Sequence, residues 1–336
     1  MKILDEGGKE KTYSPTTLLV RAYEGAMMFC LKAKQKIYQF GNIRIGGKPG
    51  ELPTVLIGNL FYKGMPEVLN HQEGTFERRK ILGWIRKAED LSERSGVPHL
   101  LDIMAMYPKA IKEYIAFVSE NVTTPFFIDG ANRETCVAAL EVVEELGLGK
   151  LVIFNGISPR TSQEELRALG DSGIDAAVLM AYNELDYSPE GRISVLEGST
   201  EKVGLLKTAN EAGIEKILVD TVVFDVPSIA LAAEATRLVK QKLGYPAGCS
   251  PANATYSWKQ ALGDSPLKKG FAAANASAHA ITQCFGADFL IYGPIKQAQN
   301  IITACAINDA IMAYFAMKRF CIKPMGKSHP IFKIFG

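Results

Sequence analysis

Eight short apolar runs of strand length alternate with longer helix-like segments along most of this 336-residue chain. A continuous apolar run bounded by turn residues is typical of a strand that is buried on both faces of a parallel sheet. The first run, PTVLIG at 53–58, follows a turn-forming glycine and proline cluster at 46–50. The eight expected strands are 53–58, 99–104, 125–129, 150–155, 176–181, 216–220, 246–249 and 288–292.

Strict alternation of strands and helices predicts βαβ crossovers and a parallel sheet. Eight such units match a single (β/α)8 TIM barrel, which usually needs about 250 residues. An open doubly wound sheet is the alternative, but it normally carries a glycine fingerprint after its first strand, and GNLF at 58–61 does not supply one. The expected helices are 75–95, 108–120, 134–146, one opening at the capping-box pattern of 161–165, 200–212, 227–243, 271–284 and 294–319.

We expect three parts in the chain. Residues 1–41 are an N-terminal extension, partly helical at 15–37, that could cover the barrel floor or contact another copy of the chain. Residues 42–320 form the pterin-binding type of barrel discussed below, and 321–336 form a C-terminal tail.

Composition narrows the class of protein. The chain is 47% hydrophobic and 22% charged, with a net charge of +2, so it lacks the clustered basic excess of a nucleic-acid-binding protein. We see no run of about 18 apolar residues that could span a membrane, and no apolar core of a signal peptide at the start. Six cysteines without CxxC spacing suit reduced thiols. We therefore expect a soluble, cytoplasmic enzyme.

The chemistry of a TIM barrel lies at the carboxyl ends of its strands. None of the expected strands ends in His, Lys or Arg, so amides and carboxylates line the predicted mouth. The polar residues there are Asn59, Asp102, Asp129, Asn155, Asn183, Asp220 and Asn253, the last in the expected loop after the seventh strand.

These residue types exclude several kinds of site. A metal site would group His or Cys with carboxylates, but the four histidines are far apart in sequence, so we expect no metal. There is no GxSxG elbow and no P-loop. A glycosidase could use Asp129 and Asp220, but it would leave the asparagines without a role. Gly293-Pro294 could begin a phosphate-binding helix or simply an ordinary one.

A ring of Asn and Asp suits a neutral heterocycle that is rich in hydrogen-bond donors and acceptors. A pterin has such an aminopyrimidinone edge, and an ionised Asp facing it would form charge-assisted bonds worth roughly 1.5–3 kcal/mol. The competing interpretation is that each Asp or Asn merely caps the next helix. That alternative applies most to Asp102 and Asn183, and Asn59 could be either.

Five segments carry a resemblance to a known family, and their order and spacing agree with it over about residues 42–318. The chain resembles the H-subunit family of tetrahydromethanopterin S-methyltransferase. The segments are GGKPGELPTVLIGNLFY (46–62), PFFIDG (125–130), FNGISP (154–159), GYPAGCSPANATYSW (244–258) and GADFLIYGPI (286–295).

The resemblance implies a function. Family members move a methyl group between a methylcorrinoid protein and N5 of tetrahydromethanopterin or tetrahydrofolate, in one-carbon metabolism. In the wider group of pterin-binding barrels, residues that match Asp129, Asn155 and Asp220 hold the pterin ring. Asn253 matches an Asn that reaches toward N5, and it is the expected catalytic residue; Asn59, Asp102 and Asn183 are weaker candidates.

The resemblance also implies partners. The corrinoid (cobalamin) is expected on a separate protein that docks over the barrel mouth, because this chain has no DxHxxG cobalamin-binding signature. The long loops after the fifth and seventh strands are expected contacts, and a homodimer is implied. We favour tetrahydrofolate as acceptor. The alternatives are a pterin-dependent transferase of the dihydropteroate synthase type, whose Lys and basic phosphate site are missing here, and a non-catalytic docking component.

Overall fold

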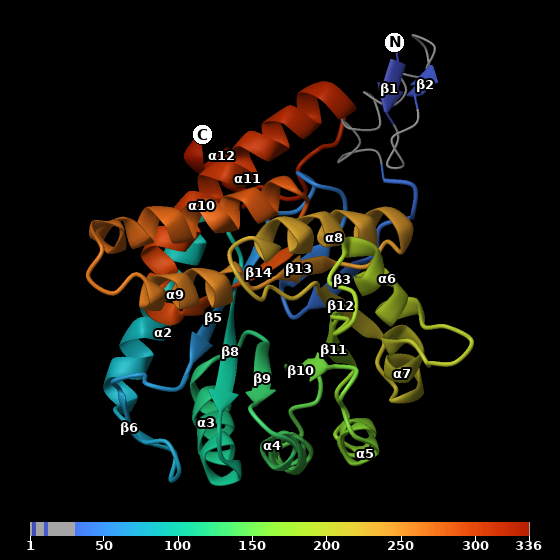
Figure 1. Cartoon of the computed structure of the whole chain (residues 1–336). Helices are drawn as coiled ribbons and strands as arrows, with labels where there is room; N and C mark the ends of the chain where they lie inside the picture. Colours follow the sequence, from blue (N-terminus) through green and yellow to red (C-terminus); the bar gives the residue numbers. More distant parts are fainter. Residues whose placement is uncertain (1, 5–9, 13–30, 336) are drawn as a thin grey trace.

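A computed structural model describes residues 2–4, 10–12 and 31–335 of the chain. Eight parallel strands close into a barrel, with helices around it (Figure 1), which confirms the predicted TIM-barrel fold. The strands are β5 (Val55–Leu60), β8 (His99–Ala105), β9 (Phe126–Gly130), β10 (Val152–Ile157), β11 (Ala176–Met180), β12 (Lys216–Asp220), β13 (Ala247–Cys249) and β14 (Phe289–Pro294).

The helices follow the expected alternation. They are α2 (Arg78–Ser95), α3 (Pro108–Asn121), α4 (Arg133–Glu145), α5 (Gln163–Asp171), α6 (Pro189–Glu197), α7 (Leu205–Glu211), α8 (Ser228–Lys242), α9 (Pro251–Ala261), α10 (Phe271–Cys284), α11 (Ala298–Phe320) and α12 (Pro330–Ile334). Two 3-10 turns, η2 (Pro266–Gly270) and η3 (Ile295–Gln297), precede α10 and α11. The capping box predicted at the start of α5 is present, formed by Ser162 and Glu165.

Some segments differ from the expectation. Helices α6, α9 and α12 were not predicted, and the helix expected at 200–212 begins only at Leu205. The start of the helix expected at 75 is instead β7 (Thr75–Phe76), which pairs with β6 (Val68–Asn70). Short helices that begin at a proline, as α6 and α9 do, show too few turns for a helical period to stand out from a loop.

Most of the helix expected at 15–37 lies outside the described residues. Its last part, 31–37, is not helical, so that part of the prediction is wrong. The chain enters β3 (Ile37–Phe40), which pairs with β4 (Ile43–Gly46) in an antiparallel hairpin across the expected boundary at 41–42. Alternating Tyr38, Phe40, Ile43 and Ile45 gives this segment the two-residue period of strands. Farther upstream, β1 (Lys2–Leu4) pairs with β2 (Glu10–Thr12).

The β3–β4 hairpin fills one end of the barrel. Its apolar side chains join a buried cluster with the interior side chains of the barrel strands, namely Phe40, Ile43, Ile45, Val55, Ile57, Leu100, Phe127, Ile153, Ala176, Val178, Leu218, Phe289 and Ile291. The barrel residues of this cluster all lie among the first three residues of their strands. The apolar plug therefore leaves the carboxyl ends of the strands for polar groups.

A buried ion pair fixes the hairpin to the barrel. The fully buried Lys240 of α8 pairs with buried Asp288, and its ammonium also donates to the Gly47 carbonyl at 2.8 Å. The second carboxylate oxygen of Asp288 accepts from the Ala247 N–H at 2.9 Å. Because each charge has hydrogen-bonded partners, the arrangement avoids the cost of an isolated buried charge.

Helices α10, α11 and α12 stack along one side of the barrel (Figure 1). By length and hydropathy alone, the helical segment Ile295–Phe320 could cross a membrane. In the fold, 44% of its most apolar 18-residue stretch is buried. Buried Asp309 of α11 accepts from the Thr54 N–H at 3.0 Å and from its hydroxyl at 2.9 Å. These contacts are those of a helix in the wall of a barrel.

Candidate functional site

A strand directs alternate side chains to opposite faces, so a residue two positions after an interior residue also faces the barrel interior. Ile57 lies in the interior cluster, and Asn59 follows it two positions later on β5. The same step leads from Leu100 to Asp102 on β8. Five polar residues reach the interior in this way, which we call the polar layer: Asn59, Asp102, Asp129, Asn155 and Asp220.

Four members of the polar layer lie on consecutive strands, β5, β8, β9 and β10. Asn59 is the register partner of Asp102, and its side-chain nitrogen lies 2.9 Å from the sulfur of Met104. Met104 is in turn the register partner of Asp129. Asp220 enters from β12, which lies opposite β8 in the closed strand order. The structure thus brings these five predicted residues to one level of one barrel.

The carboxyl groups of the polar layer are buried and poorly solvated. Burial raises the pKa of Asp129 to about 7. Burial also raises the pKa of Asp102, and the neighbouring Asp129 raises it further, while a hydrogen bond with Asn155 acts in the opposite direction. Two carboxyls this close disfavour simultaneous ionisation, so they accept protons or donor groups readily.

Two acceptors in the polar layer are unused. Among the described residues, neither Oδ1 of Asn59 nor Oδ1 of Asp102 has a hydrogen-bond partner, although both atoms are buried. Buried polar atoms in proteins are nearly always hydrogen-bonded. Unused acceptors beside carboxyls with raised pKa values fit a ligand edge that is rich in N–H donors, and a pterin ring has such an edge.

Asp220 is held by the backbone that follows it. Its Oδ1 accepts from the Val222 N–H at 2.7 Å, and Val222 has a left-handed φ of 53°. Burial raises the pKa of Asp220 to about 6, against the lowering effects of this bond and of the Arg192 charge.

Arg192 was not among the predicted residues. It is fully buried on α6, and its guanidinium donates to the carbonyls of Thr221 at 2.6 Å, Val222 at 3.2 Å and Tyr187. The sequence predicts a long loop around this residue, whereas the structure has helix α6 there. Nothing in the local sequence GRISV distinguishes it from a solvent-exposed arginine.

Asn253 lies in the first turn of α9, so its expected placement in a loop is wrong. Its side chain is exposed, and its Oδ1 lies 3.3 Å from the Ser250 hydroxyl, which also reaches the Ile291 carbonyl at 3.1 Å. This turn packs closely against Gly293 near the end of β14. If Gly293 carried a Cβ, that atom would lie only 3.1 Å from the Cβ of Ala252. Asn253 is therefore on the β13–β14 side of the mouth, outside the polar layer.

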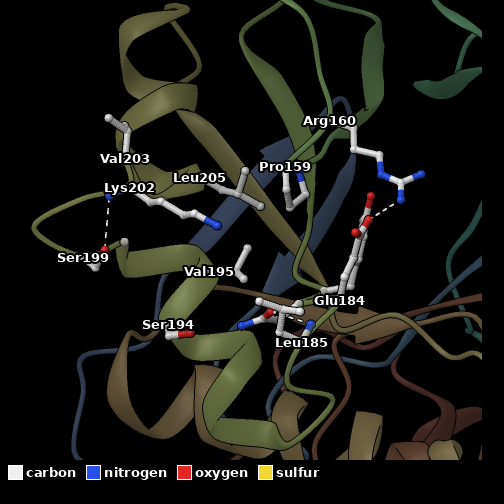
Figure 2. A pocket seen from close by; sticks show the side chains of 13 residues that line it. Pro159, Arg160, Glu184, Leu185, Ser194, Val195, Ser199, Lys202, Val203 and Leu205 are labelled. Carbon is white, nitrogen blue, oxygen red and sulfur yellow. Dashed lines mark hydrogen bonds and ion pairs between the residues drawn. The ribbon is translucent and has the colours of Figure 1, made fainter.

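Asn183 also lies outside the polar layer. It follows β11, and its Oδ1 accepts from the Leu185 N–H at 3.0 Å, which makes a local turn. It lines a pocket of about 640 Å³ beside the mouth, which we call the outer pocket (Figure 2). The outer pocket lies between the segments after β10 and β11, helix α6 and the α6–α7 connection, and its lining includes Arg160, Tyr182, Asn183, Val195, Lys202 and Leu205.

The helix-capping alternative does not hold for the seven candidates. The N-cap positions of the first α-helices that follow the eight strands are Glu77, Tyr107, Asn132, Ser162, Ser188, Pro227, Ser250 and Gln297. None of these is a candidate residue. The candidate Asp and Asn side chains therefore do not cap helices, which is the commonest structural role of these residues after a strand.

Two other kinds of site receive little support. Within residues 31–335 and the two short strands upstream, no group of three His, Cys, Asp or Glu side chains is arranged to hold a metal ion. At the Gly293-Pro294 turn, the nearest following cation is Lys296, and its ammonium pairs with Glu67 at 2.8 Å. A cation neutralised in this way is a poor phosphate ligand.

Comparison with known proteins decides the family. Residues 33–325 match the family model described as the tetrahydromethanopterin S-methyltransferase MtrH subunit. The chain belongs to this family. It is 32% identical over 314 residues to the H subunit of tetrahydromethanopterin S-methyltransferase from Methanothermobacter thermautotrophicus, covering 91% of this chain and 100% of that protein. It is 33% identical over 311 residues to the H subunit of the putative methyltransferase mtx from Methanosarcina barkeri, covering 90% and 99%.

Solved structures agree on the fold of this MtrH-family protein. Dihydropteroate synthase of Xanthomonas albilineans superposes with a TM-score of 0.55 at 16% identity, covering 83% of this chain and 99% of the synthase. The Yersinia pestis enzyme superposes with a TM-score of 0.56 at 13% identity, covering 83% and 100%. At such low identity, the likeness establishes the barrel fold alone.

Proposed function

We propose that this member of a methyltransferase family transfers a methyl group from a methylcorrinoid, carried by a separate protein, to N5 of a tetrahydropterin. The polar layer is the observation that carries the proposal. It places carboxyls with raised pKa values and unused buried acceptors above an apolar plug, at the chemically active end of a TIM barrel. The family membership of the chain supports the reaction type.

The ring would be held by Asp129, Asn155 and Asp220, which approach from three strands. In the proposed complex, an ionised Asp accepts from the 2-amino and N–H groups of the pterin, and Asn155 offers both a donor and an acceptor. Asn59 and Asp102 supply further acceptors from the adjoining strands. The apolar plug beneath them would limit how deeply the ring enters.

Asn253 is the proposed catalytic residue. Its amide cannot act as a base at ordinary pH, so its role is to hydrogen-bond and orient N5. The N5 lone pair forms the new bond to the methyl carbon, the cobalt–carbon bond breaks with its electron pair on cobalt, and the N5 proton leaves to water. Ser250, beside Oδ1 of Asn253, would help to fix the amide rotamer.

The acceptor would be tetrahydromethanopterin or tetrahydrofolate, which share the pterin ring. The first relative named above is a tetrahydromethanopterin enzyme, while our sequence-based expectation was tetrahydrofolate. In this proposal the polar layer would contact only the ring, which is the same in both molecules, so it does not favour either acceptor.

The decisive experiment mixes the protein with methylcobalamin and each reduced pterin in turn. We expect the absorption of reduced cobalt to appear together with the N5-methyl product, as measured by spectroscopy and chromatography. Binding of reduced pterin without methyl transfer would indicate a docking component. A requirement for a phosphorylated pterin substrate would instead indicate a synthase. The control is Asp129→Ala protein, in which product formation at limiting pterin should fall.

We further propose that two copies associate through one face of α10 and α11. Ile307, Ile311 and Tyr314 recur at i, i+4 and i+7 on α11, and each is about half exposed. Ile281 of the adjoining α10 is also about half exposed. The corrinoid protein would dock on a different surface, over the barrel mouth. The proposed location of the protein is the cytoplasm.

A further inference from the structure

The outer pocket has no role in the ring-binding site described above. We propose that it binds the anionic arm of the tetrahydropterin whose ring occupies the polar layer. This inference rests on the proposed function. It extends that function from the ring to the rest of the cofactor, because folates and methanopterin both carry an aromatic arm that ends in negatively charged groups.

The outer pocket begins where two strands leave the barrel. Pro159 in its wall comes four residues after Asn155 of the polar layer, a span of at most about 14 Å of extended chain. Tyr182, which also lines the pocket, comes two residues after Met180, the end of β11. A ligand that is held by the polar layer and leaves the mouth between β10 and β11 would therefore meet this pocket first.

The lining suits an aromatic arm with a charged end. Tyr182, Val195 and Leu205 provide apolar surface, and Lys202 and Arg160 provide cations. Arg160 is already paired with Glu184, and both lie on the same side of the pocket (Figure 2). The volume of about 640 Å³ lies within the range of about 300–1,000 Å³ that is usual for small-molecule sites.

Lys202 is the cation with a free ammonium. A turn holds its backbone, because the Lys202 N–H donates to the Ser199 hydroxyl at 3.1 Å and the Ser199 N–H donates to the Lys202 carbonyl at 2.8 Å. Its Nζ makes no ion pair or hydrogen bond within the part of the chain that the structure describes. Figure 2 shows the side chain extending from that turn toward the space between Leu205 and Val195. An anionic group that enters the pocket could form an ion pair with the Lys202 ammonium.

The test compares a pterin that has the arm with one that lacks it. We would measure by calorimetry the affinity of tetrahydrofolate, tetrahydromethanopterin and 6-methyltetrahydropterin for the full-length protein and for Lys202→Ala. We expect Lys202→Ala to weaken binding of the first two by about fivefold and to leave 6-methyltetrahydropterin unchanged. The matched control is Lys207→Ala on α7, whose exposed ammonium lies by Glu211 outside the pocket.

Each outcome separates the two proposals. If wild-type protein binds none of the three molecules, the proposed function fails and this inference fails with it. If it binds all three but Lys202→Ala binds the armed pterins normally, or weakens all three equally, only the pocket assignment is overturned. A loss for tetrahydromethanopterin but not for tetrahydrofolate would assign Lys202 to a phosphate, and a loss that grows with added glutamates would assign it to carboxylates.

Discussion

Arg192 and Asp220 are linked through two consecutive residues of backbone. The guanidinium of Arg192 binds the carbonyls of Thr221 and Val222, and the Val222 N–H binds the Asp220 carboxylate at 2.7 Å. A buried charge on α6 thereby fixes a proposed ring-binding carboxylate at the end of β12. Arg192 is a positioning residue, because it reaches the ring only through Asp220.

Replacement of this arginine should therefore affect both stability and binding. We expect Arg192→Met to lower the free energy of unfolding by about 2–4 kcal/mol, because three carbonyls lose their donor. Arg192→Lys should rescue little, since one ammonium cannot span the three carbonyls. Urea unfolding measures the first effect and pterin titration the second. The exposed Arg94→Met variant should change stability by under about 0.5 kcal/mol, and an equally small change in Arg192→Met would contradict the argument.

The raised pKa of Asp129 predicts that this residue lowers the free energy of unfolding of the ligand-free protein at high pH. Its pKa is about 7 in the folded protein and 3.8 in the unfolded chain, so the folded state holds this proton more tightly. The free energy of unfolding that Asp129 contributes is therefore fully present below about pH 4 and is lost as the pH rises through 7. Asp129→Asn should thus stabilise the free protein by about 1–2 kcal/mol at pH 8 and by little at pH 4. Denaturant unfolding at both pH values tests this expectation, and equal effects at the two would refute it.

Binding of the pterin should favour the ionised carboxylates. Asp129 and Asp220 have pKa values of about 7 and 6 in the free protein, so affinity should rise from pH 5 to pH 8 and binding near pH 6 should release protons. Calorimetry in two buffers of different ionisation enthalpy counts those protons. Asp129→Ala and Asp220→Ala should each weaken binding at least about tenfold and flatten the pH dependence. An affinity that is already independent of pH in the wild type would argue against ionised partners.

Asn253 should matter more for turnover than for affinity. Its exposed side chain lies outside the polar layer, so Asn253→Ala should lower kcat by about tenfold or more while changing pterin affinity by less than about threefold. Single-turnover methyl transfer from methylcobalamin gives the rate, and pterin titration gives the affinity. The control is Gln260→Ala, an exposed position farther along α9. Wild-type turnover in Asn253→Ala would remove the proposed role.

The proposed α10–α11 interface predicts that a substitution in it lowers the molecular mass of the protein in solution from that of a dimer to that of a monomer. Ile311→Glu places a charge in the exposed apolar face, so it should convert dimers to monomers without unfolding the chain. Light scattering and circular dichroism report the two properties. Arg79→Glu on α2 introduces the same side chain on a different surface and should leave the mass unchanged. A wild-type protein that is monomeric at micromolar concentration would rule out this interface.

The sequence by itself determined the barrel and the position of the polar layer in it. Eight apolar runs specified eight buried strands, and the fixed two-residue period of a strand carried Asp129, Asn155 and Asp220 into the interior once the barrel closed. These features are local and periodic, so they can be read from a single chain without knowledge of its distant contacts.

The tertiary structure alone decided the surroundings of that site. Two of the three carbonyls that Arg192 binds are about thirty residues away in the sequence. The hairpin at 37–46 packs into the barrel floor only because the barrel closes around it, and the outer pocket exists only where α6 and α7 meet the ends of β10 and β11. Such features depend on contacts between segments that are far apart in sequence, and local patterns do not encode those contacts.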